Sequence, residues 1–277
     1  MSISDWRYYN HAAIPTTAPH EVPDTSVIES GEIWKSFAKA PLLARWTTDF
    51  DCPDETDWWY VIKDEPFDIS AIKAKKRYVI KKGLENFDVR LICASDYKEA
   101  LFNVHIEAVN SYPPSQRIIP TKEGFFNSVD AWSDYLVFAA FSKEDGELAA
   151  YATVIENGSY YSFASMKSIP AYEKLQVNAA VVFTILEHLS CELAEGRYIC
   201  DGERNINHET GFQDYLISYF GFRKAYARMH LSYKPSVGWI VKLAYPIRGF
   251  IKRFDKINIV HKLMSVLQME EIVRKQK

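Results

Sequence analysis

The fold is decided by the stretch of sequence from Tyr135 to Met166, which reads YLVFAAFSKEDGELAAYATVIENGSYYSFASM. It contains three segments rich in apolar and aromatic residues: Tyr135–Phe141, Leu148–Ile155 and Tyr160–Met166. Between them stand Asp145-Gly146 and Asn157-Gly158. Asn-Gly is the strongest short hairpin signal because both central turn residues need a positive φ. The stretch therefore predicts three antiparallel strands joined by tight turns.

The segments on either side of these strands alternate between helices and strands. Upstream, we expect a strand at Asp88–Cys93, a helix that begins at the capping box Asp96–Glu99, and a second helix at Glu123–Trp132. Downstream, the apolar periodicity predicts a helix at Val177–Ala194, a strand at Arg197–Cys200, a helix that ends at Gly221 and a final strand at Phe222–Tyr233.

The remainder of the chain gives weaker signals. Residues 1–56 are punctuated by prolines and read as irregular, apart from a short helix within Ile33–Ala44, and Trp58–Ile62 reads as a buried strand. A basic helix is expected to begin at Ser70 and to end at Gly83. The last forty residues read as mostly helical, with interruptions at Pro246 and Gly249.

The loop before the long helix is a candidate phosphate site. From Lys167 to Ala180 the chain reads KSIPAYEKLQVNAA. A loop that enters a helix N-terminus presents unpaired backbone N–H groups and the positive end of the helix dipole, which suits a pyrophosphate. The small side chains of Ala179 and Ala180 would let a ligand approach the backbone. An ordinary helix start after a polar loop is the alternative interpretation.

With this order of elements and this loop, the segment Val89–Tyr233 is similar to the GNAT (acyl-CoA N-acyltransferase) superfamily. Pro170-Ala-Tyr172 and Lys174–Ala180 stand where that superfamily has its pyrophosphate loop, and Tyr219-Phe-Gly-Phe222 where it has Gly-Phe after a helix. The resemblance implies an α+β fold with a mixed, largely antiparallel twisted sheet flanked by helices. It also implies acetyl-CoA or another acyl-CoA as co-substrate, bound by Lys174, Gln176, Val177, Asn178, Ala179 and Ala180.

Two positions depart from the pattern of the superfamily. Its loop is usually Gln/Arg-x-x-Gly-x-Gly/Ala, whereas this chain has Val177 and no glycine there. The tyrosine that many members use as a general acid would fall at Ile217. Tyr219, which flanks that position, is our candidate for a catalytic tyrosine.

Upstream, the basic run Lys76–Leu84 resembles a helix of the Fem-type aminoacyl transferases, which are also built from GNAT-like modules. This second resemblance implies aminoacyl-tRNA as an alternative donor, whereas a solvated helix face is the simpler interpretation of the basic run. We divide the chain into an N-terminal extension at 1–87, with a companion half-domain as one interpretation, a GNAT-like domain at 88–233 and a basic amphipathic helical tail at 234–277.

The loop after the strand Arg197–Cys200 is dense in polar groups. The resemblance places the acyl group near this strand end, where the two central strands of the fold splay apart. Acylation of an amine needs a base and an acid. We expect Glu203 or His208 to be the base, with Asp201 as an alternative, and Arg204 to bind a carboxylate or phosphate of the acceptor. A solvated loop beside a helix cap is the competing interpretation.

Composition limits the classes of function. The net charge of −3 gives no support to a nucleic-acid partner over the whole chain, and we expect no DNA partner. Four scattered cysteines without a Cys-x-x-Cys pair argue against a cysteine-built zinc site and fit a reducing compartment, so we expect no metal and a cytoplasmic location. The chain has no basic start followed by an apolar run, and no apolar run of about 20 residues, so neither a signal peptide nor a membrane span is expected.

Charge is unevenly distributed along the chain. From Lys234 to Lys277 there are ten Lys/Arg against three Asp/Glu, a net of +7, which leaves −10 for the rest. Within this tail, large apolar residues such as Trp239 and Phe250 interleave with basic ones. A basic amphipathic helix can lie on an anionic membrane surface, or it can dock on the acidic body of the protein, and we favour docking.

The sequence therefore predicts an N-acyltransferase that moves an acyl group from acyl-CoA to a primary amine of a small molecule, amino sugar or peptide by direct attack. The first alternative is a Fem-type transferase that uses aminoacyl-tRNA. The second is a GNAT-like module that has lost catalysis and only binds a partner, which the missing loop glycines and the missing tyrosine favour.

Overall fold

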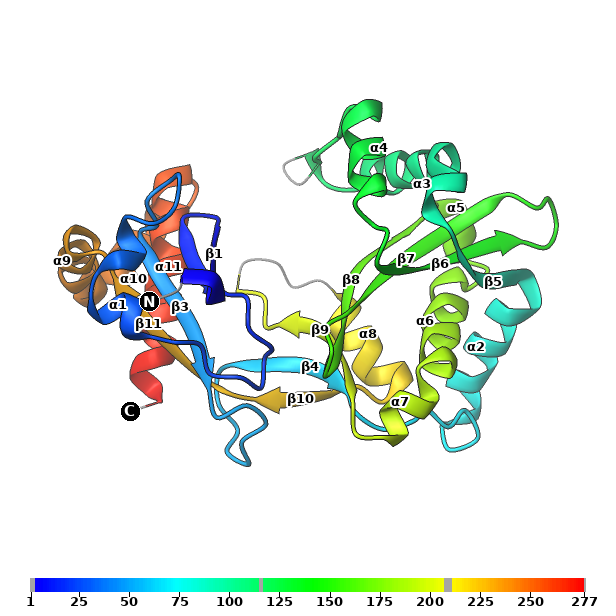
Figure 1. The fold of residues 1–277 in the computed structure, drawn as a ribbon, viewed down its shortest axis with the longest axis horizontal. Helices are drawn as coiled ribbons and strands as arrows, with labels where there is room; N and C mark the ends of the chain where they lie inside the picture. Colours follow the sequence, from blue (N-terminus) through cyan, green and yellow to red (C-terminus); the bar gives the residue numbers. More distant parts are fainter. Residues whose placement is uncertain (1–2, 115–116, 207–210, 277) are drawn as a thin grey trace. The chain divides into compact units, whose positions relative to one another are not determined.

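The structure is a computed structural model that describes residues 3–114, 117–206 and 211–276 (Figure 1). The chain forms two compact units, and each is assembled from separate stretches of sequence. The terminal unit comprises Met1–Val61, Glu203–Gly211 and Lys224–Lys277, and the central unit comprises Ile62–Gly202 and Phe212–Arg223. The domain boundaries expected from sequence, at 88 and 234, stay a prediction.

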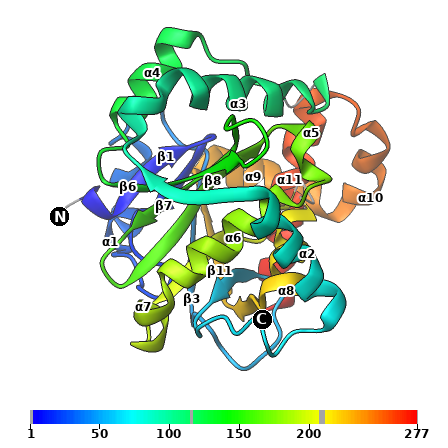
Figure 2. The same ribbon diagram turned by 90° about the vertical axis from the view of Figure 1, so that its right-hand side faces the viewer.

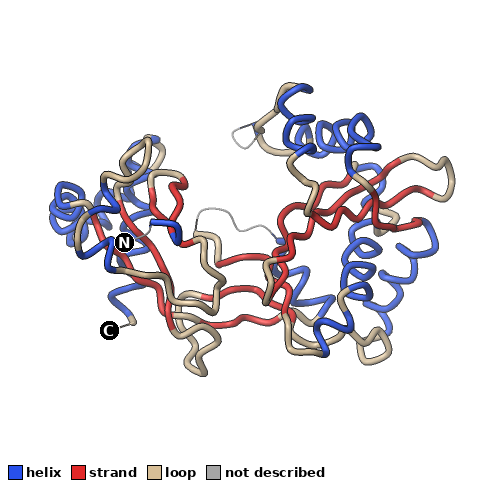
Figure 3. Tube along the Cα trace, in the orientation of Figure 1, coloured by secondary structure: helices blue, strands red, loops and turns tan. Residues whose placement is uncertain are grey.

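The larger sheet has the strand order β10-β4-β9-β8-β7-β6-β5. Figure 3 shows the strands of the chain in red. Its strands are β4 (Trp59–Lys63), β5 (Phe87–Ile92), β6 (Tyr135–Ser142), β7 (Leu148–Glu156), β8 (Tyr160–Ser168), β9 (Tyr198–Glu203) and β10 (Arg223–Tyr226). The pairs β6–β7 and β7–β8 are antiparallel, as the two turns predict, and β5 also pairs antiparallel with β6. Gly158 has a positive φ of 68°, whereas Asn157 does not have a positive φ, so the chain turns between Glu156 and Tyr160 without the positive φ expected at both turn residues.

Helices cover both faces of these strands (Figures 1 and 2). The helices of the central unit are α2 (Ala74–Asn86), α3 (Lys98–Asn110), α4 (Lys122–Asp130), α5 (Pro170–Glu173), α6 (Val177–His188), α7 (Ser190–Ala194) and α8 (Gly211–Phe220). Val137 and Ala139 of β6 join a core with Leu101 of α3 and Phe125 of α4. Phe138 points to the other face, where its ring lies 5.4 Å from that of His188. Alternation along the strand thus supplies two cores.

The pairing of β8 with β9 is parallel and short. It joins Tyr160 to Tyr198, Tyr161 to Ile199 and Ser162 to Cys200, although β8 continues to Ser168. A register shift in the β7–β8 ladder follows directly, between Val154 and Thr153 of β7, and such a bulge bends a strand. The pairing of β8 with β9 therefore ends at Cys200, and the candidate site expected from the sequence follows this residue.

The terminal unit contains a four-stranded sheet with the order β1-β2-β3-β11. Its elements are β1 (Trp6–Tyr9), β2 (Ala12–Pro15), β3 (Leu43–Thr48), β11 (Arg228–Tyr233), α1 (Ser26–Glu29), α9 (Pro235–Ala244), α10 (Arg248–Ile251) and α11 (Asn258–Lys275). Short 3-10 helices lie at Ile3–Asp5, Glu32–Trp34, Ala94–Tyr97, Tyr245–Ile247 and Lys252–Phe254, of which Ala94–Tyr97 belongs to the central unit. No helix in the described part of the chain is long and apolar enough to span a membrane.

Three expectations about individual elements were wrong. Residues 1–56 are not irregular, because β3 pairs along its whole length with β11, a partner that lies far away in sequence. The expected strand Phe222–Tyr233 is two strands, β10 and β11, which belong to different sheets. The basic helix does not end at Gly83 but continues to Asn86, since this glycine serves helix packing rather than helix termination. The expected fold class is confirmed: an α+β architecture with a large mixed sheet, flanking helices and a C-terminal helical tail.

Candidate functional site

Asp201 lies on β9, in the part of the strand beyond its pairing with β8. Burial raises the pKa of its carboxyl group to about 7, and a hydrogen bond with the side chain of Gln213 on α8 opposes that rise. Helix α8 begins close by, since the ring of Phe212 lies 5.4 Å from that of Phe163 on β8. The central unit thus places one desolvated carboxyl group where its two parallel strands separate.

A carboxyl group with this pKa suits proton transfer at neutral pH. Near neutral pH, both the ionised form, which accepts a proton, and the neutral form, which donates one, are populated. Strongly perturbed ionisable groups cluster at functional sites, and desolvation is the cause of the perturbation here. Of the candidate bases that the structure describes, Asp201 and Glu203, the first has the clearer electrostatic basis for acting as one.

Glu203, the first candidate base, is engaged in an ion pair within the terminal unit. Its carboxylate accepts a hydrogen bond from the guanidinium of Arg45 on β3, and that guanidinium lies 5.2 Å from the centre of the Trp58 ring. Burial raises the pKa of Glu203, and the positive charge of Arg45 works in the opposite direction. About 31% of the Glu203 side chain is exposed, but its carboxylate is already paired with the guanidinium of Arg45.

Arg204, the candidate acceptor-binding residue, is likewise held by its own unit. Its Nη1 donates to the carbonyl of Asp57 at 2.5 Å, and its guanidinium lies 4.6 Å from the centre of the Trp59 ring. His208, the second candidate base, lies outside the described residues. The structure thus separates the polar side chains of this strand end into one half-buried, desolvated acid and two side chains engaged by their own unit, and the site stays a prediction.

Tyr219, the candidate catalytic tyrosine, lies on α8 among other aromatic rings. Its ring centre is 5.0 Å from that of Tyr215, and the ammonium of Lys76 on α2 lies 5.7 Å from it. Lys76 also donates a hydrogen bond to the carbonyl of Ser218. Burial raises the pKa of Tyr215, so its hydroxyl stays protonated throughout the physiological range. These contacts connect α2 to the second half of α8.

The candidate phosphate loop is folded into helical turns. The N–H groups of Leu175 and Gln176 donate to Tyr172 and Glu173 at 3.0 and 2.9 Å. Those of Ala179 and Ala180 both donate to the carbonyl of Gln176, at 3.1 and 3.2 Å. Gln176 has a φ of 68°, in the left-handed region, and starts α6. Four amides of the segment are therefore occupied within the chain.

The side chains of the same segment differ in their exposure. Val177, Ala179 and Ala180 are fully buried. Gln176 and Asn178 are half-buried, and Lys174 is exposed. Helix α2 lies along the start of α6, where Lys82 Nζ donates to the carbonyl of Lys174 at 3.0 Å. Any ligand at this helix start would contact mainly the polar side chains rather than the backbone.

Sequence reasoning missed a polar cluster beneath α3. His105 Nδ1 lies 3.1 Å from the hydroxyl of Tyr151, and Lys167 Nζ donates to the hydroxyl of Tyr112 at 2.9 Å. Burial lowers the pKa of His105, and the nearby charge of Lys167 lowers it further. The signal that could have revealed the cluster is Tyr151, the one large polar side chain within the small-residue strand Leu148–Val154.

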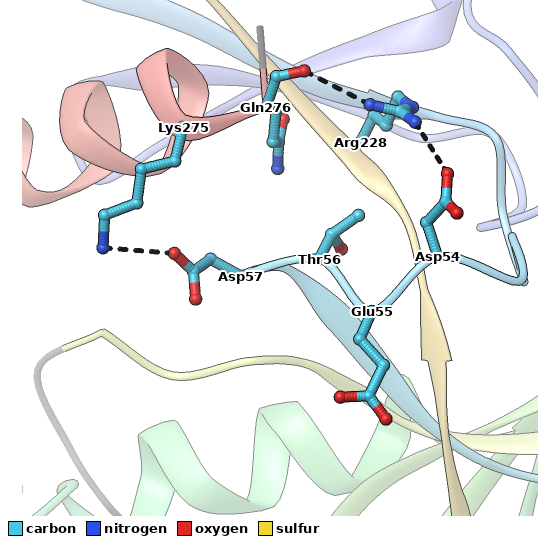
Figure 4. Close-up of a pocket in the computed structure, with 7 residues that line it drawn as sticks. All are labelled: Asp54, Glu55, Thr56, Asp57, Arg228, Lys275 and Gln276. Atoms are coloured by element: carbon cyan, nitrogen blue, oxygen red, sulfur yellow. Dashed lines mark hydrogen bonds and ion pairs between the residues drawn. The ribbon is translucent and has the colours of Figure 1, made fainter.

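A small pocket of about 260 Å³ lies in the terminal unit (Figure 4). It is lined by Asp54, Glu55, Thr56, Asp57, Arg228, Lys275 and Gln276. Arg228 pairs with Asp54 at 3.1 Å, and Lys275 pairs with Asp57 at 3.4 Å. Its cations are thus neutralised by its own carboxylates. Within residues 3–114, 117–206 and 211–276, no group of three or more His, Cys, Asp or Glu could hold a metal ion.

Comparisons with known proteins assign the fold. No protein-family model matches the chain, and no curated protein sequence matches it. Solved structures do match, and they support a GNAT-like fold with similarity to FemX.

Three of these structures match over most of the chain. The C-terminal domain of a protein assigned as a lysylphosphatidylglycerol synthetase from Agrobacterium fabrum has a TM-score of 0.52 at 11% identity, over 86% of this chain and 82% of that one. L-PGS from Bacillus licheniformis has a TM-score of 0.51 at 9% identity, over 98% and 86%. FemX has a TM-score of 0.50 at 10% identity, over 79% and 81%. At these identities the similarity is one of fold.

Proposed function

We propose that the chain is a transferase that moves an acyl group from an activated donor to a primary amine, with Asp201 as the proton acceptor. The acceptor would be a small molecule, an amino sugar or a peptide. The observation that carries the proposal is the desolvated carboxyl group of Asp201, with its pKa of about 7, at the point where β8 and β9 separate. The similarity to L-PGS and FemX supports the fold in which that carboxyl group lies.

The reaction would proceed by direct attack. The amine nitrogen forms a bond to the carbonyl carbon of the donor, and ionised Asp201 takes the proton that the nitrogen loses. The bond between the carbonyl carbon and the leaving oxygen or sulfur then breaks, and the electron pair stays on the leaving group. Protonated Asp201 returns its proton to that group. No covalent intermediate with the protein and no metal ion is needed.

We favour an aminoacyl ester of tRNA as the donor over an acyl-CoA thioester. The start of α6 offers few amides to a pyrophosphate, because those of Leu175, Gln176, Ala179 and Ala180 already bond within the chain. Helix α2 also lies directly on that helix start. A donor that does not rely on a pyrophosphate cradle at this position fits the geometry better.

The exposed face of α2 supports the same donor. Lys75, Tyr78 and Lys81 are exposed at a spacing of three residues, and Lys73 and Lys174 are exposed near the two ends of the helix. Cations spread along a helix with an interleaved aromatic ring match the phosphates and bases of a single-stranded RNA end. This face belongs to the same unit as Asp201.

Acyl-CoA remains the second candidate donor because of Lys174. Its ammonium is exposed at the start of α6, next to the half-buried side chains of Gln176 and Asn178. These groups could contact the phosphates of coenzyme A without the backbone cradle. A third alternative is a module that binds a partner but transfers no acyl group from either donor.

One experiment separates these alternatives. The full chain is incubated with a labelled pool of aminoacyl-tRNA or with labelled acetyl-CoA, together with a panel of primary amines, and label transfer is measured. Transfer from charged tRNA only, lost in Asp201→Asn while tRNA binding is kept, is the expected result. Transfer from acetyl-CoA alone would show that the donor is an acyl-CoA and not an aminoacyl-tRNA. Binding of either donor without transfer to any amine, in the wild type and the variant alike, would exclude the proposed catalysis.

A further inference from the structure

The segment from α9 to the start of α11 buries one set of apolar side chains and exposes another. Val237, Val241, Ala244 and Ile251 recur at helical spacing and pack with Met264 and Leu267 of α11, where they form a core of the terminal unit. This packing does not decide whether the tail docks on the body of the protein or lies on a membrane surface, because it uses only part of the apolar side chains. In an amphipathic helix, the side chains that do not pack on the core are normally polar.

The exposed set consists of large apolar side chains between residues 240 and 257. Its residues are Ile240, Leu243, Ile247, Phe250, Phe254 and Ile257, at spacings of three and four, which we call the exposed apolar stripe. Leu243 is 72% exposed, and Trp239 beside the stripe is 66% exposed. Eight of the fifteen large hydrophobic side chains exposed in the described chain lie between residues 239 and 259. Such a concentration on a surface marks an interaction site.

The charges around the stripe are almost all positive. Lys242, Lys252, Arg253 and Lys256 are exposed, and in the part of the chain that the structure describes none of them forms a salt bridge. The only acidic residue between 239 and 259 is Asp255, which lies 3.2 Å from His261. Lys242 and Arg253 extend over the rings of Trp239 and Phe250, at 5.4 and 5.9 Å.

From these observations we infer that the exposed apolar stripe and its cations dock the protein on the surface of an anionic lipid bilayer. Aliphatic and aromatic side chains enter the boundary between headgroups and acyl chains, while the lysines and arginine meet anionic headgroups. A second copy of the chain fits less well, because a symmetric contact would place these cations opposite one another. Nucleic acid fits less well too, since isoleucine and leucine side chains do not stack on bases.

The test uses the full chain and two kinds of vesicle. One consists of phosphatidylcholine alone, and the other contains about one third phosphatidylglycerol. Co-sedimentation is expected to show binding to the anionic vesicles at least about tenfold tighter than to the neutral ones, and weaker binding in high salt. Equal binding to both, or none to either, would overturn the inference.

Variants assign the binding to the stripe. Leu243→Gln, Ile247→Gln and Phe250→Gln combined should weaken binding by more than about tenfold, because about three apolar side chains no longer enter the bilayer. Lys252→Ala with Arg253→Ala should weaken it by about 30-fold. Ile118→Gln, which removes an exposed apolar side chain of the central unit, is the matched control and should bind as the wild type does.

Two further measurements establish that the triple variant is folded and whether the protein self-associates. The thermal midpoint of the triple variant should equal that of the wild type, because the residues changed are exposed. If the midpoint falls, the Lys252→Ala, Arg253→Ala variant alone tests whether vesicle binding depends on this surface. Size-exclusion chromatography with light scattering tests self-association. A concentration-dependent dimer that the triple variant abolishes, in a protein that binds no anionic vesicle, would assign the stripe to a second copy and refute the membrane surface.

Discussion

Gly83 of α2 packs directly against the backbone of Gln176, the residue from which α6 starts. A Cβ atom added to Gly83 would lie 2.5 Å from the carbonyl oxygen of Gln176 and 3.0 Å from the amide nitrogen of Ala180. The approach of the two helices therefore depends on the absence of a side chain at this position. It also explains why a glycine that looks like a helix end in the sequence lies inside a helix.

Substitution of this glycine tests the packing of α2 on α6. Gly83→Ala should lower the free energy of unfolding by roughly 1–3 kcal/mol, because the added methyl group meets backbone atoms that cannot move aside locally. This net loss is expected even though alanine has the higher helix propensity, by about 1 kcal/mol. Urea denaturation of the full chain measures it.

Gly249→Ala is the control for that substitution. Gly249 lies in α10, and an added Cβ atom there would meet no atom within 4 Å. Its stability should be unchanged or should rise by up to about 1 kcal/mol. A Gly83→Ala protein as stable as Gly249→Ala would show that α2 does not rest on the start of α6.

Asp201 should make the stability of the protein depend on pH. Its folded-state pKa of about 7 lies above the ordinary value of 3.8, so the folded protein holds this proton more tightly than the unfolded chain does. The resulting stabilisation is complete below about pH 4 and is lost as the pH rises through about 7. Asparagine cannot ionise. The difference in free energy of unfolding between Asp201→Asn and the wild type should therefore shift in favour of the variant as the pH rises from acid to alkaline, by up to about 4 kcal/mol.

The measurement is urea denaturation of both proteins at several pH values, with Asp134→Asn as the control. Asp134 is exposed, so its substitution controls for the loss of one surface carboxylate. Parallel profiles for the wild type and Asp201→Asn would mean that the carboxyl group of Asp201 titrates normally. Its proposed role as a base at neutral pH would then lose its physical foundation.

Glu203 should behave as a structural residue. Glu203→Gln removes the charge that Arg45 faces and should lower the free energy of unfolding by about 1–3 kcal/mol, less than for a fully buried pair because both side chains reach solvent. Arg45→Met combined with Glu203→Gln should recover part of that loss, and a double-mutant cycle measures the coupling. Transfer activity that disappears in Glu203→Gln at undiminished stability would instead make Glu203 the base.

The exposed lysines of α2 should control binding of the tRNA donor. Lys75→Ala with Lys81→Ala should weaken tRNA binding and reduce the slope of log affinity against log salt concentration by about 2, since about one counterion is released per contacted phosphate. Lys122→Ala is the control, because Lys122 pairs with Glu99 at 2.7 Å on another face of the central unit. Fluorescence anisotropy across a salt series measures both. An unchanged slope would exclude this face as the contact for tRNA.

Local signals predicted a large part of the fold. The antiparallel strands β6, β7 and β8 follow from alternation and from tight turns, since each strand pairs with its neighbour in sequence. The helices α3 and α6 follow from the period of their apolar residues. The strand end that carries Asp201 was also predicted, because a dense polar run follows the short apolar segment Arg197–Cys200.

The choice among the polar residues of that strand end needed the tertiary structure. Glu203 and Asp201 are both acidic and stand two positions apart, so nothing in the sequence distinguishes them. Arg45, which engages Glu203, lies 158 residues away, and the desolvation that raises the pKa of Asp201 comes from packed neighbours. Such effects depend on which distant segments become adjacent, which periodicity does not report.

By itself, the sequence determined the elements that local periodicity and turn chemistry specify: the three-stranded meander, the helices around it and the apolar, basic character of the tail. Only the tertiary structure decided that β3 pairs with β11, that Gly83 belongs inside a helix, and that the tail buries one apolar face while it exposes another. The physical reason is that hydrogen bonds and periodic contacts within an element are local, whereas strand pairing, close helix packing and burial of charge are set by residues far apart in the chain.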